Sequence, residues 1–243
     1  MKLLAITLLT LVSFAYAGTA DLKVADVSTP DCPVRITGEV KLTQSHQGPN
    51  LYTVRSPMVD GVNVSNKVIV ALVSRLVTTD FYGQPDIDNT EEDYFFQAEE
   101  FAPGTTKMIV HEEREGFPTK AWAEKNGKPV EIGPETAEPT ASAKVIFVQF
   151  ADGTTWGKYA AAAAIFADRK GVYDSLLRFR SIYNQGGAAA FNAAIASQRF
   201  DNRSTRSMTR RLRQEVAEHG VEAAIARLDQ SLQAAKRYPE LLK

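Results

Sequence analysis

The chain has 243 residues, of which 44% are hydrophobic and 23% charged, and its formal net charge at pH 7 is −1. This composition indicates a globular protein, and the length suits one or two domains with a hydrophobic core. The single cysteine, Cys32, excludes an internal disulfide, so packing must stabilise the fold. We interpret Cys32 as a small buried residue at the start of a strand, with an intermolecular disulfide as the alternative.

The first seventeen residues have the organisation of a secretory signal peptide. Lys2 supplies the positive start, Leu3 to Val12 carries no charge, and Ala15-Tyr16-Ala17 offers small residues before a cleavage site. The apolar run is shorter than the roughly 20 residues that span a bilayer. A buried N-terminal helix is the alternative. We expect a mature chain of 226 residues that starts at Gly18, is secreted or periplasmic, and has no transmembrane segment.

Strand patterns dominate the region from Gly18 to Gly157. Val34 to Thr43 alternates apolar and polar residues, which places Val34, Ile36, Val40 and Leu42 on one face with Gly38 as a gap. Other strand-like segments are Leu51 to Ser56, Val68 to Val77, Lys107 to Glu113 and Val145 to Phe150. Short strands separated by turns predict an antiparallel, immunoglobulin-like β-sandwich over residues 18–157.

Two connecting segments of this region have their own signals. Trp122 to Ile132 is predicted to form a hairpin, because Asn126-Gly127 suits the positive φ angles of a tight turn. Gly133 to Ser142 is predicted to be a mobile loop.

From Lys158 onward alanine is abundant and the apolar spacing becomes helical. One stripe contains Val172, Leu176, Phe179 and Tyr183, and Gly186-Gly187 is expected to break that helix. Ser204 is expected to cap the next helix, His219-Gly220 to end it, and Val221 to Ala235 to form the last one. The fold class is therefore α+β, with a mainly β N-terminal part followed by a helical region over 158–243 that packs on the sandwich.

The two parts differ in charge. Residues 18–150 contain 12 Lys and Arg against 20 Asp and Glu, whereas residues 151–243 contain 15 against 9. Such asymmetry can mark an interaction surface. We favour the alternative, in which the two parts face each other or both are merely solvated.

Catalytic and metal motifs fail on inspection. His111-Glu112-Glu113-Arg114-Glu115 begins like a zinc-protease helix but has Glu115 where the second histidine is required. The segment from Asp86 to Asp93 is acidic, yet Glu91 and Gln97 occupy the positions where a calcium loop needs Gly and Glu. We interpret it as a solvated loop, with an irregular cation site as the alternative. We predict no cofactor, no metal and no catalytic residues.

A run of arginines occupies the predicted helix after residue 199. Arg206, Arg210 and Arg213 lie on one helical face away from the apolar stripe, and such a face can meet phosphates, lipid headgroups or an acidic protein. A solvated face partly paired with the acidic sandwich is the alternative. Nucleic acid is not expected, because aromatic residues do not interleave with the arginines.

Two segments resemble other proteins. Cys32-Pro33-Val34 leads into a strand, and Val145-Ile146-Phe147-Val148-Gln149-Phe150-Ala151-Asp152-Gly153-Thr154-Thr155-Trp156-Gly157 leads into Ala-rich helices. Both resemble segments of a group of secreted bacterial proteins in which a β-sandwich precedes an Ala-rich helical region. The resemblance implies no activity. We expect an exported, non-catalytic binding or structural protein; the alternative is a secreted hydrolase whose site is assembled from scattered residues.

Overall fold

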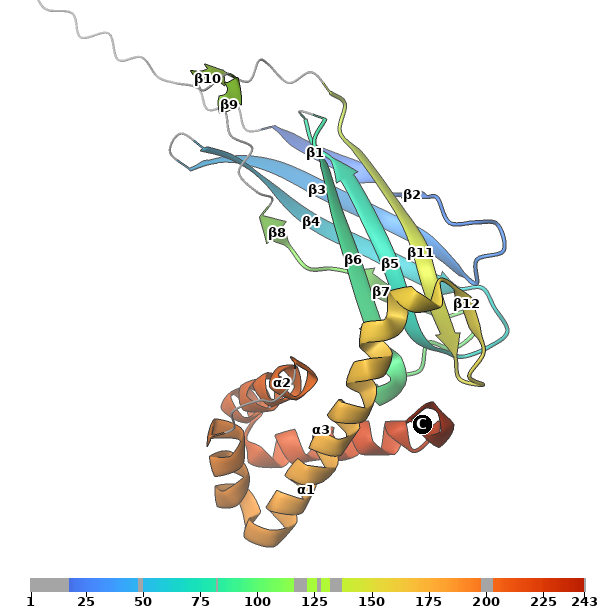
Figure 1. Ribbon diagram of the computed structural model, residues 1–243, viewed down its shortest axis with the longest axis vertical. Helices are drawn as coiled ribbons and strands as arrows, with labels where there is room; N and C mark the ends of the chain where they lie inside the picture. Colours follow the sequence, from blue (N-terminus) through green and yellow to red (C-terminus); the bar gives the residue numbers. More distant parts are fainter. Residues whose placement is uncertain are drawn as a thin grey trace, which may run out of the picture.

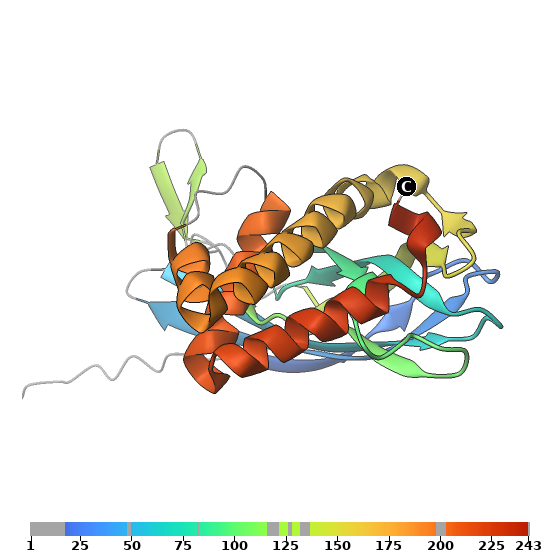
Figure 2. The same ribbon diagram turned by 90° about the horizontal axis from the view of Figure 1, so that it is seen from below.

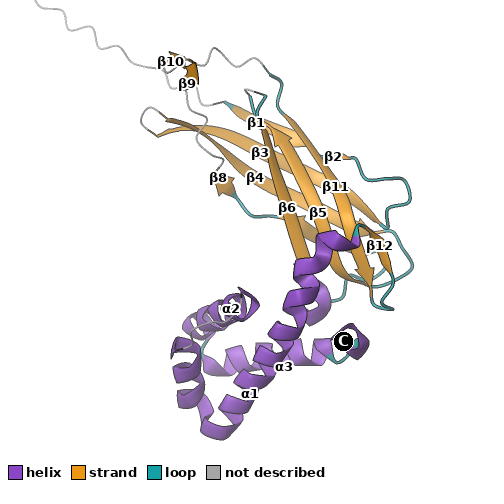
Figure 3. Ribbon diagram, viewed as in Figure 1, coloured by secondary structure: helices purple, strands orange, loops and turns teal. Residues whose placement is uncertain are grey.

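The computed structural model describes residues 18–47, 50–81, 83–115, 122–125, 128–131, 137–197 and 203–242. The predicted signal peptide and the Asn126-Gly127 turn lie outside these residues. The described chain forms two antiparallel sheets followed by helices at one end of the sandwich (Figures 1 and 3). The predicted α+β class, a β-sandwich followed by a helical region, is confirmed.

The strands fall into two main sheets and one small hairpin. Sheet 1 has the order β1 (Thr19–Lys23), β3 (Val34–Gln47), β4 (Asn50–Asn63), β7 (Thr106–Val110), and β8 (Arg114–Glu115) also pairs with β4. Sheet 2 has the order β12 (Thr155–Gly157), β11 (Thr140–Phe150), β5 (Ile69–Thr79), β6 (Pro85–Asp93), and β2 (Ala25–Asp26) pairs in parallel with β11. The predicted hairpin is present as β9 (Trp122–Lys125) and β10 (Lys128–Glu131).

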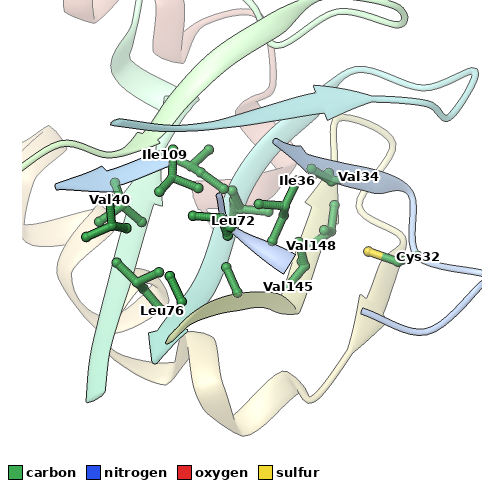
Figure 4. Packing of buried hydrophobic residues seen from close by; sticks show 14 of the residues in the cluster. Cys32, Val34, Ile36, Val40, Leu72, Leu76, Ile109, Val145 and Val148 are labelled. Atoms are coloured by element: carbon green, nitrogen blue, oxygen red, sulfur yellow. The ribbon is translucent and has the colours of Figure 1, made fainter. Parts of the chain in front are cut away.

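The sandwich core lies between the inner faces of the two sheets (Figure 4). Val34, Ile36, Val40 and Leu42 are all buried there, as their alternation predicts. They meet residues of the opposite sheet, which include Leu72, Leu76, Val145 and Val148. Gly38 has no side chain and so interrupts the row. A larger residue does not fit there, because φ is 132° and a Cβ would lie 2.2 Å from the Met58 carbonyl oxygen.

Cys32 lies at the border of this core and is 2% exposed. Its burial raises the pKa of the thiol, which keeps the sulfur protonated and unreactive near neutral pH. The interpretation of Cys32 as a small buried residue agrees with this position.

The helical region consists of η2 (Tyr159–Ala162), α1 (Ala163–Ser197), α2 (Arg203–His219), α3 (Val221–Ala235) and η3 (Pro239–Leu242). Gly187 has a non-helical φ of 63°, so the predicted break at Gly186-Gly187 is present within α1. Gly220, with a φ of 89°, separates α2 from α3 as predicted. None of the helices in the described part of the chain combines the length and apolar character needed to cross a membrane.

The three α-helices share a core of their own. It contains Leu176, Phe179, Phe191, Leu212 and Leu228, and the predicted stripes of all three helices contribute to it. Helices α1 and α3 run side by side when the molecule is seen from below (Figure 2). The apolar periodicity therefore identifies the buried face of each helix correctly.

The helical region is also packed on the sandwich. The start of α1 covers the outer face of sheet 2, where Ile165 packs with Ala71, Val73 and Phe147. At the other end of the region, the Arg237 guanidinium binds the carboxylate of Glu100 at 3.0 Å and the backbone carbonyl oxygen of Gln97. Part of the charge asymmetry is thus compensated between the two parts, as the favoured interpretation holds.

Three local predictions were wrong. The acidic segment from Asp86 to Asp93 belongs to the strand β6 and is not a loop. Helix α2 starts at Arg203, so Ser204 lies inside it and is not its cap. Strand β11 begins at Thr140, which shortens the predicted loop, whose residues 133–136 lie outside the described part.

Residues 145–157 form the junction of the two parts. Asp152 accepts hydrogen bonds from the Thr154 amide and hydroxyl and pairs with Lys67, which lowers its pKa to about 2. Gly157 has a φ of 86°, and a Cβ there would lie 2.2 Å from the Ile146 carbonyl oxygen. Asp152 and Thr154 therefore stabilise the turn, and glycine at position 157 allows the close approach to the backbone of Ile146.

Candidate functional site: a cleft between the sandwich edge and the helices

A cleft of about 1250 Å³ lies where the edge of the sandwich meets the helical region. Its lining comes from five separate parts of the chain: β6 with η1 (Tyr94–Phe96) and the residues after it, the β7–β8 turn, α1, α2 and α3. The helical region lies at one end of the sandwich (Figure 1), and residues of both β6 and α2 line the cleft.

Strand β6 forms one wall of the cleft. All six residues from Asp88 to Asp93 line it, so both faces of the strand and the edge between them are turned to the same space. Within the described residues, β6 pairs with β5 and with no other strand. The free edge of sheet 2 therefore opens into the cleft.

Arginines neutralise some of the carboxylates of β6. Arg55, which is 2% exposed, reaches across the sandwich to Asp88 at 3.4 Å and to Asp86 at 3.0 Å, and Arg114 binds the other oxygen of Asp88 at 2.9 Å. These carboxylates bind guanidinium groups, which is why an acidic segment is stable as a strand.

Arg169 neutralises the last carboxylate of β6. Its side chain is 1% exposed and donates two hydrogen bonds to Asp93, at 2.8 Å and 3.2 Å, and a third to Gln149 at 2.8 Å. The guanidinium also lies 4.6 Å from the centroid of the Phe95 ring. Arg169 thus joins α1 to β6, β11 and η1 at the base of the cleft.

Glu91 and Glu92 differ from the other acids of β6, because neither forms an ion pair within the described part of the chain. Burial raises the pKa of Glu92, and the nearby charges of His111 and Arg211 oppose that rise. Glu91 is exposed. The wall thus offers two carboxylates whose charges are not directly paired.

Helices α2 and α3 supply the opposite wall. Arg210 and Arg211 of α2 are exposed, and neither has a hydrogen bond or ion pair among the described residues. Arg227 of α3 also lines the cleft but binds Glu215 at 2.6 Å. The two walls therefore present unpaired charges of opposite sign.

The three arginines of the predicted basic face have different environments. Arg210 lines the cleft, and Arg206 is exposed but lies outside it. Arg213 donates hydrogen bonds to the carbonyl oxygens of Ile195 and Ala196, at 2.5 Å and 3.1 Å. Arg213 therefore holds the end of α1, whereas Arg206 and Arg210 form no hydrogen bond or ion pair with any described residue.

Apolar side chains lie between the two charged walls. Val172 and Leu176 of α1, Met208 and Leu212 of α2, and Leu228 of α3 contribute to the lining. Because the cleft has charged walls and apolar residues between them, it suits an extended ligand that has both charged and apolar groups. Small-molecule pockets measure roughly 300–1,000 Å³, and the volume of this cleft exceeds that range.

The acidic segment shows no arrangement suited to a metal ion. Asp86, Asp88 and Asp93 are all bound to arginines, and no group of three or more potential ligand side chains comes together among the described residues. The irregular cation site considered from the sequence therefore gains no support.

Sequence reasoning missed most of the cleft. His111 and Arg211 oppose the rise in the pKa of Glu92 although the three residues lie in three different parts of the chain. The sequence offers one signal for the cleft, which is the density of acids in β6 and of arginines in α2. That signal does not show that the two segments line the same cleft.

No protein-family model, curated protein or solved structure matches this chain.

Proposed function

We propose that the chain is an exported, non-catalytic binding protein that holds a segment of a macromolecular partner in the cleft between β6 and α2. The observation that carries the proposal is the pair of facing walls, with unpaired Glu91 and Glu92 on one side and unpaired Arg210 and Arg211 on the other. Opposite charges on two walls orient a bound ligand, because each wall attracts groups of the opposite sign.

The size and floor of the cleft support a macromolecular partner. Val172 and Met208 of the floor are only partly buried and supply apolar area whose further burial favours association, and the charged walls supply selectivity. The space exceeds what a small molecule fills. Arg206, which forms no ion pair with any described residue, extends the positive wall beyond the cleft, and this fits a partner whose surface continues past the cleft and is acidic there.

Export is the second part of the proposal, and it is supported by the order of Lys2, the uncharged run and Ala15-Tyr16-Ala17. N-terminal sequencing of the protein from the extracytoplasmic fraction is expected to begin at Gly18. Recovery of the intact chain with Met1 at its end would contradict export by cleavage.

Site-specific photo-crosslinking tests the binding function. A photoreactive side chain at position 210, inside the cleft, is expected to give a discrete adduct when the full chain is expressed in its own cell envelope. The matched control is position 177, where Leu177 is 45% exposed on α1 and does not line the cleft. Equal adducts at both positions, or none at position 210, would contradict a partner in the cleft.

The hydrolase alternative rests on one observation: Glu92 lies in the cleft with His111, and its pKa is raised by burial. A carboxylic acid of raised pKa beside a histidine has the properties of a general acid. Turnover of ester, peptide or glycoside substrates that Glu92→Gln abolishes, with unchanged thermal stability, would favour the enzyme. We expect no such turnover.

A further inference from the structure

Strand β6 ends sheet 2 with unused backbone groups. In an antiparallel strand, alternate residues turn their N–H and C=O groups toward each neighbour. In the described chain β6 pairs only with β5, and six of its nine residues, Asp88 to Asp93, line the cleft, so about three residues present both groups to the cleft. Proteins usually shield such edges, whereas this one borders a large open space.

The register of β5 and β6 defines which acids lie on which face. Glu91 is opposite Val73, which packs on the outer face of sheet 2 against α1, so Glu91 is on that outer face. Asp168 of α1 lines the same cleft and forms no ion pair among the described residues. The outer side of the edge therefore carries two carboxylates without a paired cation.

The inner side of the edge is different. Glu92 is opposite Leu72 of the sandwich core, so it lies on the inner face. His111 and Arg211 already act on its charge. A strand added beside β6 would therefore meet the carboxylates of Glu91 and Asp168 on the outer face of the sheet. On the inner face it would meet only Glu92, whose charge His111 and Arg211 already offset.

We propose that β6 accepts an extended segment of a partner protein as an additional strand of sheet 2, with Lys or Arg at every second position facing Glu91 and Asp168. The main-chain hydrogen bonds supply affinity and the alternating cations select the partner. This inference rests on the proposed function, because it specifies the segment that the cleft holds.

Binding of synthetic peptides to the full chain tests the inference. The probe is a fluorescently labelled peptide of five Thr-Lys repeats, measured by anisotropy, with a Thr-Glu peptide as the charge control. A third peptide keeps the Thr-Lys sequence but carries N-methyl groups on its four central residues, which removes hydrogen-bond donors and keeps the charge. We expect saturable binding of the first peptide only.

Two charge-reversal variants locate the bound peptide. Glu91→Lys is expected to weaken binding of the Thr-Lys peptide about fivefold to twentyfold, because attraction to the lysines becomes repulsion. Glu39→Lys makes the same charge change at an exposed site on β3, outside the cleft, and is expected to leave binding unchanged.

The outcomes separate this inference from the proposed function. Equal binding of the N-methylated peptide, equal effects of the two variants, or no binding of the Thr-Lys peptide up to about 1 mM would overturn strand addition. In each of these cases an adduct at position 210 would still support a partner in the cleft, and absence of the adduct would overturn the proposed function as well.

Discussion

Replacing Arg169 with Met is expected to lower the free energy of unfolding by about 3–5 kcal/mol, the usual effect of removing one partner of a buried ion pair. Met keeps much of the packing volume but leaves the Asp93 carboxylate and the Gln149 side-chain oxygen without their donors. The contact with the Phe95 ring is lost as well. Denaturant unfolding of the purified protein measures the change.

The loss should depend on pH in a defined direction. Burial raises the pKa of Asp93 above its ordinary value of 3.8, and Arg169 opposes that rise. Without Arg169 the folded-state pKa rises further, so the folded state binds a proton that the unfolded state releases. Part of the lost stability is therefore expected to return as the pH falls from neutral toward 3.8.

Two variants control for the Arg169 experiment. Lys170→Met changes the neighbouring exposed residue of α1 and is expected to alter stability by less than about 0.5 kcal/mol. Adding Asp93→Asn to Arg169→Met removes the stranded charge and should recover part of the loss. Equal effects of Arg169→Met and Lys170→Met would show that Arg169 does not anchor α1.

Replacing Leu228 with Asp is expected to destabilise the helical region by more than about 5 kcal/mol, because it combines the loss of a buried Leu with the burial of a charge. Leu228 is 1% exposed and lies in the core shared by all three α-helices. Loss of helical circular dichroism at a temperature where the sandwich remains folded would locate the effect in this region.

Arg210→Gln is the matched surface change for the Leu228 experiment. Arg210 is exposed and forms no ion pair in the described part of the chain, so its replacement is expected to change stability by less than about 0.5 kcal/mol. Similar effects of the two variants would mean that the helices are not held by their apolar stripes.

Local patterns predicted much of the fold. The alternation from Val34 to Leu42 identified the inner face of β3, and the spacing of Val221, Ile225 and Leu228 identified the buried face of α3. Glycine at positions 187 and 220 marked helix boundaries, because both residues have positive φ. Period and backbone geometry are properties of short segments, and short segments are visible in the sequence.

The strand β6 shows why other parts could not be predicted. Its acids suggest a solvated loop, but Arg55, Arg114 and Arg169 stabilise them as a strand. These arginines come from β4, β8 and α1, far away in sequence, so the compensation appears only in the folded chain. The same holds for the cleft, whose opposing walls come from β6 and α2.

Arg213 shows a related limit. Helical periodicity places it with Arg206 and Arg210, yet its guanidinium binds carbonyl oxygens at the end of α1. A helical pattern shows which residues share a side of the helix. It does not show that one long side chain of that side will cap a neighbouring helix.

Hydrogen exchange of the β6 amides is the most direct test of the cleft as the binding surface. In the isolated protein, the edge amides of β6 are expected to exchange faster than those of β5, which is paired on both sides. Addition of extract from the native envelope is expected to slow the exchange of β6 and of the cleft-lining part of α2, and to leave β3 unchanged. Unchanged exchange in β6 and α2, with protection elsewhere on the molecule, would contradict the account.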